Sequence, residues 1–198
     1  MSILELFVGY IRTTSPLELT AVFTSLTYVI LAARGSRLCW YFAFASSSIY
    51  MSLFFGVQLY LESILQLFYV VMAVYGFLSW NTNESSGKIK KWPVKYHLIN
   101  AGLSLLATLL LGYLFSSLTD QSSPYIDAFT TTFSLAATFM VAQRVLENWI
   151  YWIIIDAVST YLYFSKGLEI SGMLMFVYTI LAAFGLFRWY KQYQLQRV

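Results

Sequence analysis

Residues Glu147 to Gly167 read E-N-W-I-Y-W-I-I-I-D-A-V-S-T-Y-L-Y-F-S-K-G, a long and mostly apolar stretch. As a helix that rises about 1.5 Å per residue, it is long enough to cross the roughly 30 Å hydrocarbon core of a bilayer. Near its middle lies Asp156, with apolar sequence on both sides. An unpaired carboxylate is costly at that depth, so an acidic residue there indicates a functional site. The stretch predicts a transmembrane helix that carries a site.

One face of this helix has the chemistry to bind a solute. Trp149, Trp152, Asp156 and Tyr163 are spaced i, i+3, i+7 and i+14, which places them on the same side. Two indoles beside a carboxylate suit a flat, cationic, aromatic solute. For Trp149, which is near the end of the helix, a place in the interfacial aromatic belt is an equally good interpretation.

The composition is that of a polytopic membrane protein. Hydrophobic residues make up 59% of the chain and charged residues 11%, which is unlike a soluble domain. The all-α fold that we predict has seven transmembrane helices in one membrane domain over residues 1–198. The predicted spans are 17–33, 38–56, 59–80, 97–118, 126–143, 148–165 and 168–188.

The basic residues predict the orientation. With the N-terminus outside and the C-terminus in the cytoplasm, ten of the 12 Lys and Arg residues face the cytoplasm, and only Arg12 and Lys166 face outward. This satisfies the positive-inside rule. The ten are Arg34, Arg37, Lys88, Lys90, Lys91, Lys95, Arg144, Arg188, Lys191 and Arg197. The net charge of +3 therefore reflects topology, and we expect no nucleic-acid partner.

Several classes of site are excluded by what the sequence lacks. One cysteine and one histidine exclude a disulfide framework and a Cys/His metal cluster. No phosphate-binding Gly-rich loop is present, which argues against an ATP-driven pump. A single mid-membrane Asp without an intramembrane His offers no catalytic arrangement, so we expect no enzyme and no cofactor.

The chain matches itself at an offset of 109 residues. Trp40 then pairs with Trp149, and Trp80 pairs with Trp189, without a gap. The offset superposes a first three-helix repeat, residues 17–80, on a second at 126–189, and leaves 97–118 as a linker helix. Because one linker helix restores the direction, the repeats run parallel, and a solute site is expected at mid-depth at their interface, as in the SWEET transporters.

The first repeat supplies further candidate residues. Gln66 is an amide well inside the third span, and Ser47 is the counterpart of Asp156 at the 109-residue offset. Each also has a packing interpretation: Gln66 as an interhelical hydrogen bond, Ser47 as a helix contact, and Asp156 as the partner of either. The predicted substrate-binding residues are Trp149, Trp152, Asp156, Gln66, Ser47, Tyr151, Tyr163, Tyr69 and Asn148.

The motif E-N-W-x-x-W, the three-one-three helix plan and the Y-G-F-L-S-W end of the third span resemble the Pnu-type bacterial vitamin transporters. The resemblance covers the chain from the first span to Trp189. It implies a homotrimer in the bacterial inner membrane. It also implies facilitated diffusion of a vitamin that is trapped inside the cell by phosphorylation.

Two positions bear on the vitamin. In the nicotinamide riboside members of the family, Asn occupies the position of Asp156, and a second Asn follows the third-span Gln by seven residues, where this chain has Ala73. Losing an amide and gaining a carboxylate favours a cation with an aminopyrimidine-like donor. The prediction is therefore thiamine, with nicotinamide riboside as the alternative.

A seven-helix receptor or sensor is the rival class of protein. A photoreceptor of that kind needs a lysine deep in the last span for a Schiff base, and neither of the last two spans has one inside. A solute carrier remains the more economical interpretation.

Overall fold

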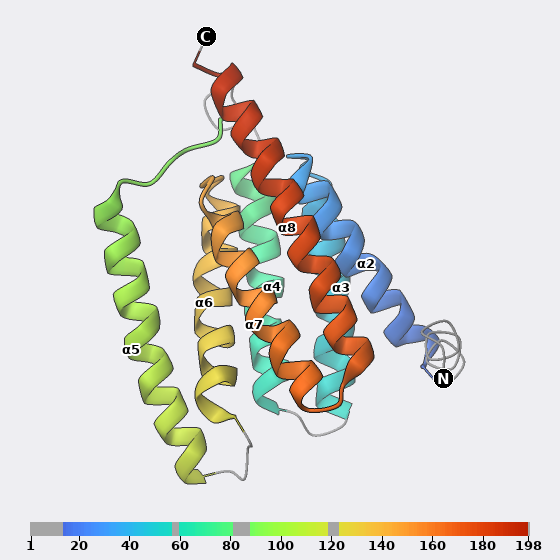
Figure 1. Cartoon of the computed structure of the whole chain (residues 1–198). Coiled ribbons are helices and arrows are strands. Elements are labelled where there is room, and N and C mark those ends of the chain that lie inside the picture. Colours follow the sequence, from blue (N-terminus) through green and yellow to red (C-terminus); the bar gives the residue numbers. More distant parts are fainter. Residues whose placement is uncertain (1–13, 57–59, 81–87, 119–122, 198) are drawn as a thin grey trace. The chain divides into compact units, whose positions relative to one another are not determined.

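The computed structural model describes residues 14–56, 60–80, 88–118 and 123–197. Arg12 and residues 81–87 of the polar stretch after the third span lie outside this part of the chain. The described residues form seven helices (Figure 1). They are α2 (Pro16–Ala33), α3 (Cys39–Gly56), α4 (Tyr60–Ser79), α5 (Val94–Leu118), α6 (Pro124–Ala142), α7 (Asn148–Ser165) and α8 (Glu169–Leu195). The all-α fold is confirmed, and the seven helices follow the order of the seven predicted segments.

Length and composition qualify five of these helices to cross a membrane: α2, most of α4, α5, α6 and α8. The other two, α3 and α7, are equally long at 18 residues each. They are less apolar because α3 carries three consecutive serines and α7 carries Asp156. Each of them packs between two other helices: α3 contacts α2 and α4, and α7 contacts α6 and α8. A helix covered on two sides can place polar groups against protein, away from lipid.

The chain divides into two compact units, residues 1–88 and 89–198. The first unit contains α2, α3 and α4, and the second contains α5 to α8. The predicted linker helix, α5, packs on α6 within the second unit. Thr108 and Thr132 share a buried hydrogen bond of 2.7 Å across this contact, and the ring of Tyr125 lies against Gly112. These small and hydroxylated residues let two membrane helices approach closely.

A tryptophan pair holds the first unit together. The rings of Trp40 in α3 and Trp80 after α4 meet edge to face, with centroids 5.3 Å apart at 85°. The indole of Trp40 also lies against Gly76, where an added Cβ would overlap the ring. Both tryptophans are buried. The glycine is therefore required for the close approach of α3 and α4.

The same arrangement recurs in the second unit 109 residues later. Trp149 in α7 and Trp189 in α8 meet edge to face, with centroids 5.5 Å apart at 86°. The indole of Trp149 lies against Gly185. The residue types and the ring geometry thus agree between the two units.

The turn before each middle helix also agrees. Gly35 ends α2 with a φ of 69°, and Arg144, 109 residues later, ends α6 with a φ of 55°. The Gly35 amide donates to Ala32 at 2.9 Å, and the Arg144 amide donates to Val141 at 2.9 Å. The next amide in each turn bonds five residues back, at 3.0 Å and 2.9 Å. Both turns are Schellman motifs, which need a left-handed residue after the helix.

Helix α8 runs seven residues beyond the predicted span end at position 188. The apolar run stops at Arg188, but the helix continues because its last turns pack on the segment before α5. The Gln196 side chain accepts a 3.0 Å hydrogen bond from the Ile89 amide. Lys91 lies over the rings of Tyr190 and Tyr193, at 5.5 Å and 5.2 Å from their centroids. Tertiary contacts, not hydropathy, set the end of this helix.

Candidate functional site

Asp156 is the central feature of the candidate site. It lies in the middle of α7 and is 7% exposed. Its backbone carbonyl accepts a 2.7 Å hydrogen bond from the Thr160 hydroxyl. For its carboxylate, the described part of the chain supplies neither a hydrogen bond nor an ion pair. A buried carboxylate in a membrane helix without a protein cation is a place where a cationic solute gains a strong contact.

Trp152 lies one turn before Asp156, on the same side of α7. The buried residues of this helix form an arc that includes Asn148, Ile155, Ser159 and Leu162, and at 100° per residue Trp152 falls in the middle of that arc. It is nevertheless only half-buried. Among the described residues, no other aromatic ring packs against it. An indole in this position has a face that a flat solute can cover.

Trp149 has a different environment from Trp152, although the sequence places both on one face. It is 2% exposed and packs between Gly185 and Trp189. These contacts give Trp149 a packing role, and its burial removes it from the aromatic belt. Its role in binding stays a prediction.

Asn148 fixes the start of α7. Its side chain is fully buried, and its Nδ2 donates a 2.6 Å hydrogen bond to the Val145 carbonyl in the turn after α6. Its Oδ1 is buried without a hydrogen-bond partner in the described residues. The residue thereby holds the turn from which α7 begins.

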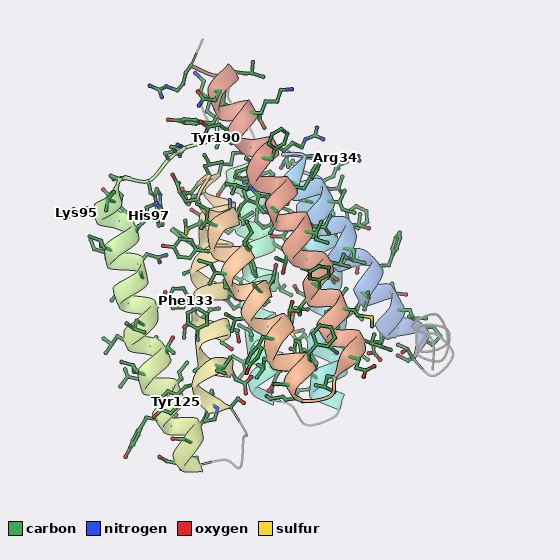
Figure 2. All side chains as sticks on the ribbon, viewed as in Figure 1. Arg34, Lys95, His97, Tyr125, Phe133 and Tyr190 are labelled. Atoms are coloured by element: carbon green, nitrogen blue, oxygen red, sulfur yellow. The ribbon has the colours of Figure 1, made fainter. Side chains whose placement is uncertain are left out.

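Tyr151 belongs to a cluster that the sequence did not indicate. Its hydroxyl lies 3.2 Å from Nδ1 of His97 in α5, and Nε2 of His97 lies 3.8 Å from the Glu147 carboxylate. Glu147 also accepts a 3.3 Å hydrogen bond from the Trp92 amide. Figure 2 shows His97 at the start of α5, where it faces the neighbouring helices. The i, i+4 spacing of Glu147 and Tyr151 indicates that both lie on one face of the helix. It does not indicate His97, the residue near both of them, because His97 is far away in sequence.

The remaining predicted residues lie on three helices. Tyr163 is half-buried near the end of α7. Ser47 in α3 is 7% exposed, and Gln66 and Tyr69 in α4 are half-buried. The last three belong to the first unit, and their part in binding stays a prediction.

The two middle helices share four buried positions at the 109-residue offset. Helix α3 buries Cys39, Trp40, Ala43, Ser46 and Ser47, and α7 buries the counterparts of four of them, Asn148, Trp149, Ile155 and Asp156. The helices differ at Trp152, which is half-buried and replaces the buried Ala43, and at Ser159 and Leu162, which are buried although their counterparts in α3 are half-buried. The second unit therefore has the half-buried indole of Trp152 and the carboxylate of Asp156 where the first unit has the methyl group of Ala43 and the hydroxyl of Ser47. Among the described residues, no cluster of His, Cys, Asp and Glu has the composition to hold a metal ion.

Comparison with known proteins places this arrangement in a family. Residues 15–191 match the family described as "Nicotinamide mononucleotide transporter". The chain belongs to this family. The match covers all seven helices apart from the last residues of α8, so the family assignment rests on nearly the whole chain.

Relatives of the chain are named as transporters of different vitamins. The nicotinamide riboside transporter PnuC of Escherichia coli is 20% identical over 87% of this chain and 84% of that protein. The PnuC of Neisseria mucosa is 26% identical, over 86% and 70%. The riboflavin/roseoflavin transporter RibM of Streptomyces davaonensis is also 26% identical, over 81% and 78%.

A solved structure supports the fold of the family. The crystal structure of the vitamin B3 transporter PnuC superposes with a TM-score of 0.72, covers 94% of this chain and 86% of that one, and is 23% identical. The chain is therefore a multi-pass membrane protein of a bacterial vitamin transporter family.

Proposed function

We propose that this chain carries a cationic aromatic vitamin across the bacterial inner membrane by facilitated diffusion. The observation that carries the proposal is Asp156, a buried carboxylate at mid-helix with no cation against it among the described residues. A substrate cation offsets the cost of the buried charge, which gives the site affinity for cations over neutral rings. Trp152 supplies the ring on which the vitamin stacks.

Nicotinamide riboside is the first candidate substrate. Its pyridinium ring is flat and positively charged, which fits both an indole face and a carboxylate. The PnuC relatives are named for this vitamin. Riboflavin, the vitamin in the name of RibM, has an uncharged ring system and gains less from Asp156.

Thiamine is the second candidate substrate. Of the two sequence features that favour it, Asp156 and Ala73, only Asp156 still supports it. Its thiazolium is a cation, and its aminopyrimidine can donate a hydrogen bond to Asp156. The other sequence argument for thiamine is that Ala73 stands where the nicotinamide riboside members of the family have Asn. Ala73 is 1% exposed in α4, as is its counterpart Ala182 in α8. A packing role accounts for an alanine at this position without reference to the substrate.

We also propose that the helices form two parallel three-helix repeats joined by α5. The matching tryptophan pairs and the matching turns at Gly35 and Arg144 support this arrangement. The proposal includes the homotrimer and the intracellular trapping by phosphorylation that the family resemblance implies.

Isothermal titration calorimetry on the purified protein tests the proposed function. Nicotinamide riboside, thiamine, riboflavin and uncharged nicotinamide form the panel. We expect nicotinamide riboside or thiamine to bind at least about tenfold more tightly than either neutral compound, which corresponds to about 1.4 kcal/mol. Tighter binding of riboflavin than of both cations would overturn the proposal and favour a RibM-like function.

A further inference from the structure

Exposed cations gather at the end of the second unit where α8 terminates. They are Lys90, Lys91, Lys95, Arg188, Lys191 and Arg197, here called the basic ledge. At this end the described residues of the unit have one acidic side chain, Glu147, which already contacts Trp92 and His97. Asp127 and Glu169 lie in the first turns of α6 and α8, at the opposite end. The ledge is therefore strongly positive.

The backbone under the ledge is fixed by pairing. The Lys90 amide donates to the Arg144 carbonyl at 2.9 Å, and the Lys90 carbonyl accepts from the Leu146 amide at 2.8 Å. Ile89 is 4% exposed, and its amide bonds to Gln196. Because Ile89 is buried and the main chain of Lys90 is hydrogen-bonded, the exposed Lys90 side chain extends from a fixed backbone position.

Aromatic side chains join this segment to α8. Lys91 lies over the rings of Tyr190 and Tyr193, and the Arg197 guanidinium is 5.8 Å from the centroid of Tyr193. Figure 2 shows Tyr190 near the end of α8 and Lys95 at the start of α5. Tyrosine beside Lys and Arg is the composition found at the boundary between lipid and water.

The length of α8 places the ledge at the level of the lipid headgroups. Its 27 residues span about 40 Å, whereas the hydrocarbon core is about 30 Å thick. The last two turns, which carry Arg188, Lys191 and the tyrosines, therefore extend past the hydrocarbon. Phosphate groups of lipids lie at this depth.

We propose that the basic ledge binds the phosphate groups of anionic phospholipids and so anchors the second unit to the membrane surface. Each Lys or Arg near an anionic membrane contributes roughly a fivefold increase in binding. Six exposed cations on the segment before α5, the first turn of α5 and the end of α8 give selectivity for anionic over zwitterionic lipid. The proposal does not depend on which vitamin is carried.

The test compares short-chain phosphatidylglycerol with short-chain phosphatidylcholine, titrated into the full chain in neutral detergent. We expect phosphatidylglycerol to bind more tightly, and Lys90→Gln/Lys191→Gln to weaken it by roughly 20-fold or more. Lys90→Arg/Lys191→Arg should retain the affinity. Lys166→Gln, which removes a cation at the opposite end of the unit, should change it less than twofold. High salt should reduce the preference.

The melting temperature in neutral detergent verifies that each variant is folded. If the double variant does not fold, Lys191→Gln alone should still weaken binding roughly fivefold, because this side chain is exposed. Equal affinity for the two lipids, or unchanged affinity in a folded glutamine variant, would overturn the proposal. So would inorganic phosphate that binds with the same affinity and the same lysine dependence, since the ledge would then be a site for a free anion.

Discussion

At the scale of single residues, two carboxylates of the second unit differ in their surroundings. Asp156 is 7% exposed and without a cation among the described residues, whereas Asp127 forms an ion pair of 3.4 Å with Lys166 at a partly exposed position. In the proposed function, a substrate cation offsets the cost of burying the Asp156 charge, whereas water and Lys166 already stabilise the charge of Asp127.

Asp156→Asn should weaken the binding of the cationic vitamin by about 1.5–3 kcal/mol, the range for hydrogen bonds to charged groups. Asparagine keeps an acceptor but loses the charge. Calorimetry on the purified variant measures the change, with Asp127→Asn as the matched control, which should bind like the parent. Unchanged affinity in Asp156→Asn would leave Asp156 as a packing residue.

Substitution of the two tryptophans of W-x-x-W should affect different quantities, vitamin binding for Trp152 and thermal stability for Trp149. Trp152→Ala should reduce vitamin binding by roughly 1–3 kcal/mol, because it removes a stacking surface, and should change thermal stability little. Trp149→Ala removes a buried ring from the contact with Trp189 and Gly185, so it should cost about 3–5 kcal/mol of stability. Melting curves and calorimetry on both variants measure the two quantities. Equal losses of binding at similar stability would contradict this division.

At the scale of elements, the close contacts of α3 with α4 and of α7 with α8 depend on one glycine each. A Cβ at Gly76 or Gly185 would overlap the indole of Trp40 or Trp149. Gly76→Ala and Gly185→Ala should therefore each destabilise the protein by about 1–3 kcal/mol, the range for overpacking. The matched control is Gly102→Ala in α5, where a Cβ meets nothing within 4 Å. That variant should be neutral or more stable, since alanine favours a helix.

The contact of α5 with α6 gives a second prediction at this scale. Thr108 and Thr132 share a hydrogen bond, and each hydroxyl is also within reach of a carbonyl in its own helix. A double-mutant cycle with Thr108→Val and Thr132→Val should give a coupling energy of about 0.6 kcal/mol, the average between membrane helices. Thermal unfolding of the four proteins measures it. Strict additivity would show that the two hydroxyls bond only within their own helices.

At the scale of the whole molecule, the distribution of charge predicts the orientation in the membrane, and a single-cysteine experiment can measure it. Cys39 is the one cysteine in the sequence and is fully buried, so it gives little background. With the N-terminus outside, Lys166→Cys should react with an impermeant thiol reagent on intact cells. Arg197→Cys should react only after the cells are opened. The opposite pattern would invert the topology.

Transport should be uncoupled from ion gradients. Asp156 is the one acidic residue with apolar sequence on both sides, whereas proton-coupled carriers have chains of titratable groups in the membrane. In liposomes without a kinase, uptake of labelled vitamin should stop at equal concentrations inside and outside, with or without a pH gradient. Accumulation above the external concentration under an imposed proton or sodium gradient would refute uncoupled transport.

The all-α class of fold and the position of the Asp156 carboxylate in the middle of a helix could both be predicted from the sequence. Span length and hydropathy depend on local composition, so seven helices could be counted from apolar runs. The isolation of Asp156 in apolar sequence was equally visible, since the cost of a charge in lipid does not depend on its neighbours. The 109-residue offset showed in advance which tryptophans correspond.

Which residues of one predicted helix face are buried and which are exposed could not be predicted from the sequence, because it depends on how the helices pack. Trp149 and Trp152 lie on the same face by helical spacing, but Trp149 packs against Gly185 and is buried, whereas Trp152 is half-buried. The extent of α8 and the contact of His97 with Tyr151 likewise depend on segments far apart in sequence. Periodicity predicts which side of a helix a residue occupies, whereas the partner it meets depends on how the helices pack.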